Sequence, residues 1–579
     1  MRRRGAAVAA TAVAFTMIVG ACGSSSSGGD NTNGSGATTN GQGQVSGLKG
    51  QDINVQPVSA LKQGGTVKWS VDQYTTQWNY NQVDGPEATT SNVLGAIMPT
   101  PMVSQADASV VADPNFITKI SETSASPQTI TAELNPDAKW SDGTSITEAD
   151  YAANFTACDG KHKGYQCASN TGYNQIKSVS EGDNGKFSVV VVFKKPFTDW
   201  KAIFDTFLYP AHYMSTADLF NTGYVSKIPV TGGPFGNPQF NKSAQTVTVT
   251  PDPNWWGDKP LLDKIVFETL SSTAANQAYV NGEINFDYDV AVDPDDYKQI
   301  NKAKDGHVTL AAGPDYRQIT VSSVHGFMTD EKVRQAVMMG INRDLLIKSD
   351  LNHIPWPTVP LNNHFFMNSQ DGYTDNTANL GTYNPTAAEQ LLKDDGFVKD
   401  KNGYYAKGGK EIDLEFMIPD GIVSSQNEGE LTQELLKQIG IKVHINAVPI
   451  NQWSGKYLTP GKFDLAPFSW LGTPFPISSS LSIYSSPKNG GGQNFTGTAN
   501  PQVDTLLKQA VSEPDATKAT DLANQADKLL YQEVHTITLF QRPQMCGVTN
   551  GLANLGSFGF ASIDYTKIGY QSSPSTTSS

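Results

Sequence analysis

The chain has 579 residues, of which 38% are hydrophobic and 17% are charged, and its formal net charge at pH 7 is −14. Such a length and composition are typical of a soluble globular protein with more than one lobe. An acidic balance of this size disfavours nucleic acid as a partner.

The N-terminus has the features of an export signal. Arginines at positions 2–4 precede an apolar run over 5–19, which is shorter than the roughly 20 residues that a membrane-spanning helix needs. This pattern predicts a signal peptide over 1–21. The tetrapeptide Val-Gly-Ala-Cys that ends at Cys22 resembles a bacterial lipobox, in which the cysteine is diacylated and becomes the mature N-terminus. The alternative is an ordinary secretory signal with a chance cysteine.

Polar composition marks both ends of the mature chain. Residues 23–50 are almost wholly Gly, Ser, Asn, Thr and Gln, a composition too polar to fold and suited to a flexible tether. We therefore assign 22–63 to the lipidated cysteine and a disordered tether. The Ser/Thr-rich end predicts a disordered tail over 570–579.

The first folded element is a strand over 65–71, where apolar and polar residues alternate. The loop over 72–81 follows and contains Tyr74, Trp78 and Asn79. Aromatic side chains on a loop have less reason to be core than those on a strand, so this loop is a candidate ligand contact.

A capping-box variant of Thr147 and Asp150 predicts a helix that continues through Phe155. The next residues contain Cys158 and Cys167, nine positions apart in a polar loop. Export to an oxidising compartment makes a local disulfide the first hypothesis. The alternative is a metal site with His162, which lacks a fourth ligand and a recognised spacing.

Further elements follow in chain order. The pattern predicts strands at 185–193, 245–250, 264–270, 414–417, 441–445 and 536–543, and helices at 196–213, 272–280, 327–347, 384–397, 428–439, 501–507 and 517–530. In the helix at 327–347, Val333, Val337 and Ile341 recur at helical spacing and predict a buried face. His444 alternates with apolar neighbours and is expected to face solvent.

Several motifs together resemble one family. They are KWSDGTSITEADYAANF at 139–155, Gly-Pro-Phe at 233–235, the Trp-Gly-containing stretch at 254–265, Gly-Glu-Ile-Asn at 282–285 and FMTDEKVRQAVMMGINRDLLI at 327–347. In this order they resemble solute-binding protein family 5, the oligopeptide, dipeptide and nickel-type binding proteins of ATP-driven ABC importers. Asn285 departs from the usual Asp.

The resemblance implies an α/β, two-lobed periplasmic-binding-protein-like fold (class II, longer type with an extra subdomain), with the ligand cleft between the lobes. Crossing strands are expected to join the lobes. The expected divisions are lobe I at 64–93, 228–321 and 533–569, the extra subdomain at 94–227, and lobe II at 322–532.

The resemblance also implies where the ligand lies. Trp470 is expected at the floor of the cleft. Peptide-binding relatives commonly have Asp three positions after this Trp, and that carboxylate pairs with the ammonium of the peptide, whereas here Thr473 stands at that place. Either another acid pairs with the ammonium or the ligand has no free amine. The candidate ligand-binding residues are Tyr74, Trp78, Asn79, Trp470, Gly472, Thr473 and Phe475.

Catalysis has little support, because the sequence has no His-Glu-x-x-His, Gly-x-Ser-x-Gly or phosphate-binding Gly-x-x-x-x-Gly-Lys-[Ser/Thr] motif. We expect no cofactor and no metal. By resemblance, the function is a monomeric, lipid-anchored binder on the outer face of the cytoplasmic membrane, which passes peptides or peptide-like solutes to an ABC permease and its ATPase subunits. The alternative is a non-peptide solute, such as a glycan fragment or a metal chelate.

Overall fold

The computed structural model describes residues 38–39 and 45–572. The predicted signal peptide, Cys22 and residues 573–579 of the predicted tail therefore lie outside the described residues. Within the described part, none of the helices combines the length and the apolar character that a membrane crossing requires.

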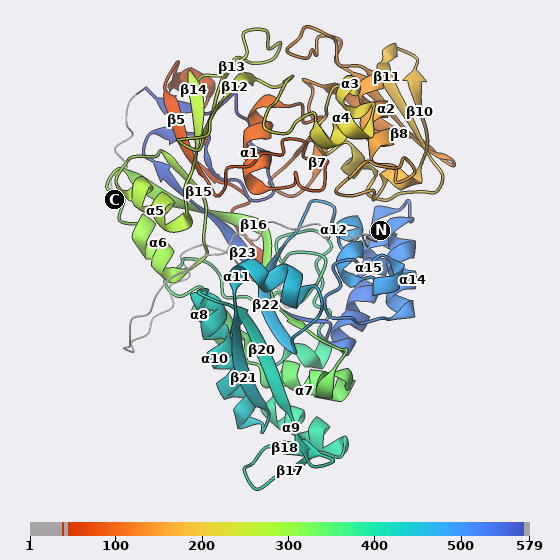
Figure 1. The fold of residues 1–579 in the computed structure, drawn as a ribbon, viewed down its shortest axis with the longest axis vertical. Coiled ribbons are helices and arrows are strands. Elements are labelled where there is room, and N and C mark those ends of the chain that lie inside the picture. Colours follow the sequence, from red (N-terminus) through yellow and green to blue (C-terminus); the bar gives the residue numbers. More distant parts are fainter. Residues whose placement is uncertain (1–37, 40–44, 573–579) are drawn as a thin grey trace, which may run out of the picture.

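A mixed sheet of ten strands runs through the upper and lower parts of the molecule in Figure 1. Its strand order is β12-β13-β14-β5-β15-β23-β16-β22-β20-β21. The strands are β5 (Thr66–Val71), β12 (Phe235–Asn241), β13 (Thr246–Pro251), β14 (Lys264–Thr269), β15 (Phe286–Val290), β16 (Gly306–Val321), β20 (Asp413–Pro419), β21 (Lys442–Val448), β22 (Leu465–Leu471) and β23 (Thr536–Thr549).

The two longest strands, β16 and β23, join the two parts. They are antiparallel, and their pairing runs from Gly306 opposite Thr549 to Thr320 opposite Thr536. At one end β23 pairs with β15, and at the other end β16 pairs with β22. Both strands are buried along most of their length, as expected of strands covered on both faces. The expected pair of crossing strands is therefore present.

The upper part also contains a separate sheet with the order β10-β11-β9-β8, formed by β8 (Ile117–Ala125), β9 (Gln128–Leu134), β10 (Ile176–Gly182) and β11 (Gly185–Phe193). It lies within the sequence range that we predicted for the extra subdomain. Helix α2 (Glu148–Ala157) lies beside it, and the Asp150 carboxylate accepts the Thr147 N–H at 2.8 Å, as the capping pattern predicted.

One predicted helix, at 196–213, is wrong. The structure has only a 3-10 turn at Trp200–Ile203 and a short helix α3 (Ala211–Met214) in this range. The backbone between them is held by other segments, because Leu208 N–H donates to the Pro99 carbonyl and Asn154 donates to the Tyr209 carbonyl. Pro210 also disfavours helical geometry at the residue before it.

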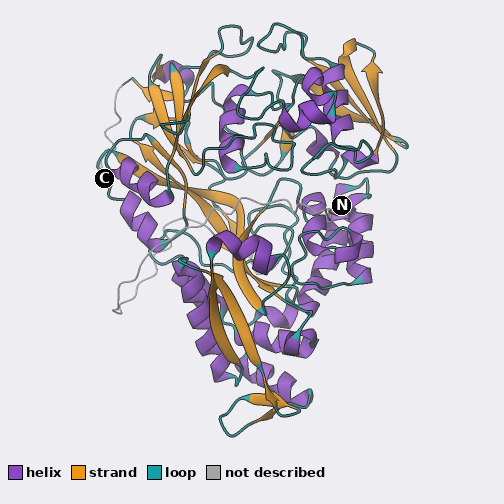
Figure 2. Cartoon of the chain, in the orientation of Figure 1, coloured by secondary structure: helices purple, strands orange, loops and turns teal. Residues whose placement is uncertain are grey.

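The lower part contains the helices α7 (Glu331–Gly340), α8 (Arg343–Asp350), α10 (Val423–Gln438), α14 (Pro501–Val511) and α15 (Ala516–Glu533). Helices α8 and α10 lie beside β20 and β21 (Figure 2). The single helix predicted over 327–347 is in fact α7 and α8, because Ile341 and Asn342 leave helical geometry and the Asn342 side chain caps α8. Val333, Val337 and Ile341 are buried, and His444 is exposed, as predicted.

The segments predicted to be disordered, 22–63 and 570–579, include residues that are part of the fold. Strand β3 (Asp52–Ile53) pairs with β25 (Gly556–Ser557), and β4 (Leu61–Lys62) pairs with β26 (Gly569–Gln571). The Tyr570 hydroxyl also donates to the Thr66 carbonyl at 2.7 Å. Polar composition hid these short pairings, because two-residue strands leave no periodic pattern.

A direct contact joins the extra sheet region to the lower part. Thr198 N–H donates to the Val511 carbonyl at 2.8 Å, and its hydroxyl donates to the Ala510 carbonyl at 2.7 Å. The neighbouring Asp199 carboxylate accepts the Ser478 N–H at 2.9 Å. These residues form what we call the Thr198 latch (Thr198 and Asp199 with Ser478 and α14), and it spans the two parts.

Candidate functional site

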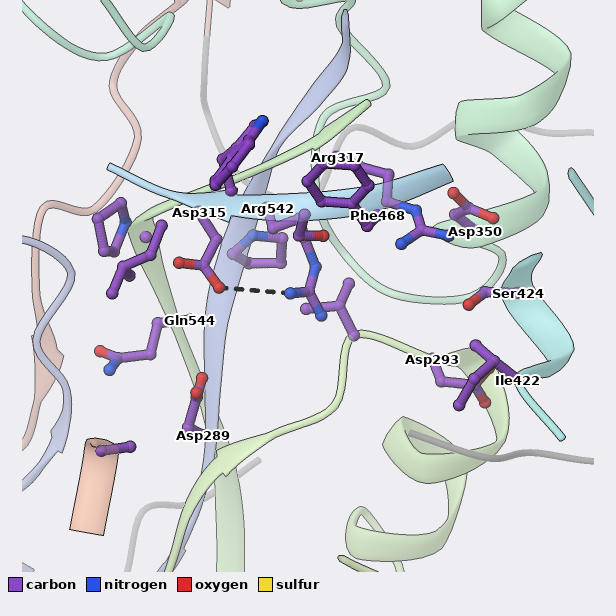
Figure 3. A pocket seen from close by; sticks show the side chains of 18 of the residues that line it. Asp289, Asp293, Asp315, Arg317, Asp350, Ile422, Ser424, Phe468, Arg542 and Gln544 are labelled. Carbon is purple, nitrogen blue, oxygen red and sulfur yellow. Dashed lines mark hydrogen bonds and ion pairs between the residues drawn. The ribbon is translucent and has the colours of Figure 1, made fainter. Parts of the chain in front are cut away.

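A cavity of about 420 Å³ lies where the crossing strands pass between the two parts of the molecule. This volume lies within the range of small-molecule sites. Its lining residues come from the upper part, such as Ser91 and Tyr288, and from the lower part, such as Pro419 and Trp453. Figure 3 shows the central charged side chains of this cavity.

The apolar wall of the cavity is aromatic. Trp470 and Phe468, on β22, line it together with Trp453 and Phe540. The Trp470 ring stacks on Phe495 with ring centroids 5.7 Å apart and planes 12° apart, so its position is fixed by packing. Such a wall provides the apolar area that holds a solute, while polar groups fix its orientation.

Three charged side chains face the cavity from interruptions in the sheet. The ladder between β16 and β23 shifts between Ala312 and Tyr316, and this shift contains Asp315. Arg542 lies across from it on β23. Asp289 lies at the shift between β15 and β23, and its backbone has a φ of 51°. β-bulges of this kind redirect side chains, and they are over-represented next to active sites.

Asp315 and Arg542 form an ion pair, with Arg542 Nη1 3.3 Å from Asp315 Oδ2. The other carboxylate oxygen, Asp315 Oδ1, is buried and has no hydrogen-bond partner among the described residues. Burial raises the pKa of Asp289, and the charges of Asp315 and Asp72 add to this effect while Arg542 opposes it. Burial also raises the pKa of Asp315, again opposed by Arg542.

A second charged group lies at the other end of the cavity. Arg317 donates to Glu428 through Nε at 2.8 Å and through Nη2, and it also donates to the Ser425 hydroxyl at 3.0 Å. Glu428 is fully buried, so its charge is matched by Arg317. Asp350 lies beside them, and burial first and the Glu428 charge second raise its pKa well above the ordinary value.

The cavity lining carries more acidic than basic groups. Its carboxyl-bearing residues are Glu87, Asp289, Asp293, Asp315 and Asp350, and its basic residues are Arg317 and Arg542. Because Arg317 is paired with Glu428, Arg542 is the one lining cation left to balance these carboxyl groups within the described chain. The cavity therefore favours a cationic group on its occupant.

The predicted run after the cleft tryptophan is only partly at the cavity. Trp470 lines it, whereas Gly472, Thr473 and Phe475 do not. Gly472 N–H donates to the Pro314 carbonyl at 3.0 Å, and the Thr473 hydroxyl accepts the Phe475 N–H at 3.1 Å. The Thr473 side chain thus stabilises the local turn in this structure.

The predicted ligand residues of the loop at 72–81 lie away from the cavity. Trp78 is 1% exposed and packs against Phe240, with ring centroids 5.5 Å apart. Asn79 is buried and donates to the Phe220 carbonyl at 2.8 Å. Tyr74 is partly buried against the same core, and Tyr80 is the one member of this loop that lines the cavity.

The cysteines lie outside the cavity. Cys158 and Cys167 form a disulfide with their Cα atoms 5.5 Å apart, and Cys546 is a buried free thiol. His162 lies 3.0 Å from the Asp159 carboxylate. Among residues 45–572, no group of three or more His, Cys, Asp and Glu side chains has an arrangement that could hold a metal ion.

Four charged cavity residues were not predicted from the sequence: Asp289, Asp315, Arg317 and Arg542. The available signal was a charge inside an otherwise buried strand, since Arg317 and Arg542 both interrupt apolar β runs. Charged residues are almost never buried unless they are paired. This signal would have selected the two arginines, and Gly313-Pro314 before Asp315 marks the break in the strand.

Three comparisons with known proteins agree with this architecture. The profile of the "Bacterial extracellular solute-binding proteins, family 5 Middle" matches residues 112–492. The oligopeptide-binding protein OppA of Mycobacterium tuberculosis is 32% identical over 522 residues, which cover 90% of this chain and 87% of OppA.

Solved structures show the same fold. A periplasmic EDTA-binding protein, EppA, superposes with a TM-score of 0.83 at 22% identity, covering 91% of this chain and 99% of EppA. The oligopeptide-binding protein AppA of Bacillus subtilis, in complex with a nonapeptide, superposes with a TM-score of 0.72 at 20% identity. The superposition covers 89% of this chain and 100% of AppA. With its two lobes, its crossing strands and its interlobe cavity, this chain belongs to family 5 of the extracellular solute-binding proteins of ABC importers, and it is a binder rather than an enzyme.

Proposed function

We propose that this protein captures peptides or peptide-like solutes in the interlobe cavity and delivers them to an ABC permease driven by separate ATPase subunits. The observation that carries this proposal is the cavity itself, which combines an aromatic wall with an excess of carboxyl groups at the crossing strands. The relatives named as oligopeptide-binding proteins support a peptide ligand.

A negatively charged metal chelate fits this cavity less well. The EppA neighbour is an EDTA-binding protein by name, and EDTA complexes of divalent metals are anions. The carboxyl groups that line the present cavity would repel such a complex. We therefore favour a peptide over a metal chelate.

The mechanism that we propose is closure of the lobes around the solute. Lobe I (64–93, 228–321 and 533–569, with the extra subdomain 94–227) and lobe II (322–532) would move about β16 and β23, which connect them. A solute that contacts both walls binds the closed form better and shifts the equilibrium towards it. Trp470 is the residue of the predicted set that we place at the ligand.

We also propose that the protein is a monomer held on the outer face of the cytoplasmic membrane by lipids on Cys22. The support is the lipobox-like sequence that ends at Cys22 and the polar stretch over 23–50 that follows it. The family is extracellular by its description.

The test of peptide binding is saturable thermal stabilisation. The purified protein is incubated with increasing amounts of a randomised pentapeptide pool, its unfolding temperature is followed, and the pool is analysed by mass spectrometry afterwards. We expect the unfolding temperature to rise and then saturate, as mass action requires of a ligand that binds the folded state, with no new product in the pool. An unchanged unfolding temperature at millimolar peptide would contradict the proposal.

A further inference from the structure

The carboxylates of Asp289 and Asp315 lie near one arginine, and the three side chains come from the three central strands of the sheet. Figure 3 shows Asp289, Asp315 and Arg542 in one part of the cavity, with the Asp315–Arg542 ion pair drawn between them. Arg542 can neutralise one carboxylate. The second is then left without a matched charge in a partly buried site, which is unfavourable unless the carboxyl group takes up a proton or a cation binds there.

A free bonding position also exists at this place. Asp315 Oδ1 is buried without a hydrogen-bond partner among the described residues, and buried carboxylate oxygens in folded proteins are normally bonded. The side chain as a whole is 27% exposed and lines the cavity, so the carboxylate is reached from the cavity although Oδ1 itself is covered. A ligand donor that meets the carboxylate from this side would supply a hydrogen bond that the described chain does not.

The residue that would otherwise bind an amine does not do so here. The Thr473 hydroxyl accepts a backbone N–H within its own turn, and Thr473 lies outside the cavity lining. A hydroxyl also cannot neutralise an ammonium. A carboxylate from elsewhere in the chain is required if the ligand carries a free amine.

We propose that Asp315 and Asp289 together bind the free ammonium group of the ligand, with Arg542 holding the Asp315 carboxylate in place. This inference rests on the proposed peptide-binding function and adds to it a preference for ligands with an unblocked amine. An ammonium donates up to three hydrogen bonds, so a ligand nitrogen that bonds to Asp315 keeps donors for a second acceptor. Charge-assisted bonds of this kind are about twice as strong as neutral ones.

The other acidic end of the cavity is a poorer amine site. Arg317 already neutralises Glu428, and Asp350, which is 5% exposed, lies in the same cluster. Burial and the neighbouring Glu428 charge favour the protonated form of Asp350, and a neutral carboxyl group does not neutralise an ammonium. Asp350 is nevertheless an alternative amine site, and the experiment must distinguish it from Asp315 and Asp289.

The experiment is a competition within one sample. The protein is mixed with equal amounts of a randomised pentapeptide library with free amines and the same library N-acetylated with an isotopic label. Bound peptides are separated from free peptides by rapid size exclusion and counted by mass spectrometry. The ratio of free-amine to acetylated peptides does not depend on the fraction of protein that is folded, so a destabilised variant still gives an answer.

We expect the wild type to retain free-amine peptides about tenfold to a hundredfold better than acetylated ones, which is the value of a hydrogen bond to a charged group. Asp315→Asn and Asp289→Asn should each lower this ratio, and the double variant should bring it close to one while acetylated peptides are still bound. Asp420→Asn is the matched control, since it makes the same change at an exposed residue outside the cavity lining, and it should keep the wild-type ratio.

Other outcomes would overturn the inference in distinguishable ways. If the wild type retains neither library, peptide binding itself fails and the inference fails with it. If it retains both equally, peptide binding stands but the amine site does not exist. If Asp350→Asn removes the preference while Asp315→Asn and Asp289→Asn keep it, the site lies at the other end of the cavity. If the double variant loses acetylated peptides as well, Asp315 and Asp289 do not act specifically on the ammonium group.

Discussion

Asp289 combines an unusual backbone with an unusual carboxyl group. Its φ of 51° is uncommon for a residue other than glycine, and the bulge in β15 directs its side chain to the cavity wall. Burial raises its pKa, as do Asp315 and Asp72, and Arg542 lowers it. The neighbouring Tyr288 and the Cys546 thiol also interact with its charge.

This raised pKa predicts pH-dependent binding. An ordinary Asp, with a pKa of about 3.9, stays ionised between pH 7 and pH 5, whereas Asp289 gains a proton in that range. A protonated Asp289 cannot neutralise a ligand ammonium, which itself stays charged there because its pKa is about 8. We therefore expect the affinity for free-amine peptides to fall as the pH is lowered from about 7 to about 5.

Calorimetry of the best-retained free-amine peptide at several pH values checks this. The Asp289→Asn variant, which has no proton to gain at this position, should bind more weakly at neutral pH and change less on acidification. A wild-type affinity that is constant over this range would contradict the prediction.

At the scale of single residues, the sequence predicted packing better than it predicted the cavity lining. Trp470, which the resemblance to the family marks, lines the cavity, and its contact with a ligand stays a prediction. Asp289 and Asp315 could not be selected, because each depends on a local break in strand pairing and a single sequence carries many similar acids. Trp78 and Asn79 were expected at the ligand because they lie on a loop, but that loop folds back against the core through Phe220 and Phe240.

Among the elements, the loop that contains Cys158 and Cys167 is stabilised by a disulfide. The disulfide closes a short polar loop that follows α2, and Cys167 also forms a β-bridge with Gln82. The disulfide therefore fixes the shape of this loop, and the β-bridge joins the loop to the segment before α1 (Ala88–Ile97).

We predict that replacing both cysteines with serine lowers the free energy of unfolding by about 2–3 kcal/mol, as a disulfide that closes a short loop usually contributes. Urea unfolding of the wild type and the double variant measures this. Cys546→Ser makes the same change at a cysteine outside the disulfide, and its unfolding is measured for comparison. Non-reducing peptide mapping should find Cys546 as a thiol, and a bridge from Cys546 to either partner would contradict the assignment.

The helices show how element boundaries escape a sequence pattern. The apolar spacing over 327–347 was right about the buried face of α7 but did not reveal the break before α8, because Asn342 caps the second helix without interrupting the apolar period. The false helix at 196–213 failed for another reason. Its backbone groups are satisfied by the distant residues Pro99 and Asn154, and such long-range bonds leave no local signal.

For the whole molecule, the Thr198 latch predicts a link between closure and affinity. The latch joins the segment after β11 to α14 across the two parts, so these bonds exist only while the two parts are this close. Removing the Thr198 hydroxyl should favour the open form. At about 1 kcal/mol for one hydrogen bond, Thr198→Val should weaken ligand binding about fivefold.

Calorimetry with the same peptide measures this effect. Thr222→Val is a matched control, because the Thr222 hydroxyl bonds only within its own helix, to the Asp218 carbonyl. The latch would play no part in closure if the Thr198 and Thr222 variants bound the ligand equally well.

The membrane anchor is also a property of the whole molecule. We predict that Cys22→Ser releases the protein from the membrane fraction, because each acyl chain contributes about 0.8 kcal/mol per buried methylene group and serine accepts no such chain. Fractionation of cells that express either form tests this. Equal membrane retention and unchanged signal cleavage would show that Cys22 is not the anchor.

The pairing of β3 with β25 and of β4 with β26 brings the two ends of the described chain together. These pairs form small sheets outside the ten-stranded sheet. The β3–β25 pair is joined to β16, because Leu310 N–H donates to the Asp52 carboxylate at 3.0 Å and the Thr309 and Ser557 hydroxyl oxygens lie 2.9 Å apart. For a protein held through its N-terminal segment, as we propose, the tether therefore joins the molecule at its upper part. Closure is a motion of one part relative to the other, so energy transfer between two fluorescent labels, one on each part, would follow it in the tethered protein.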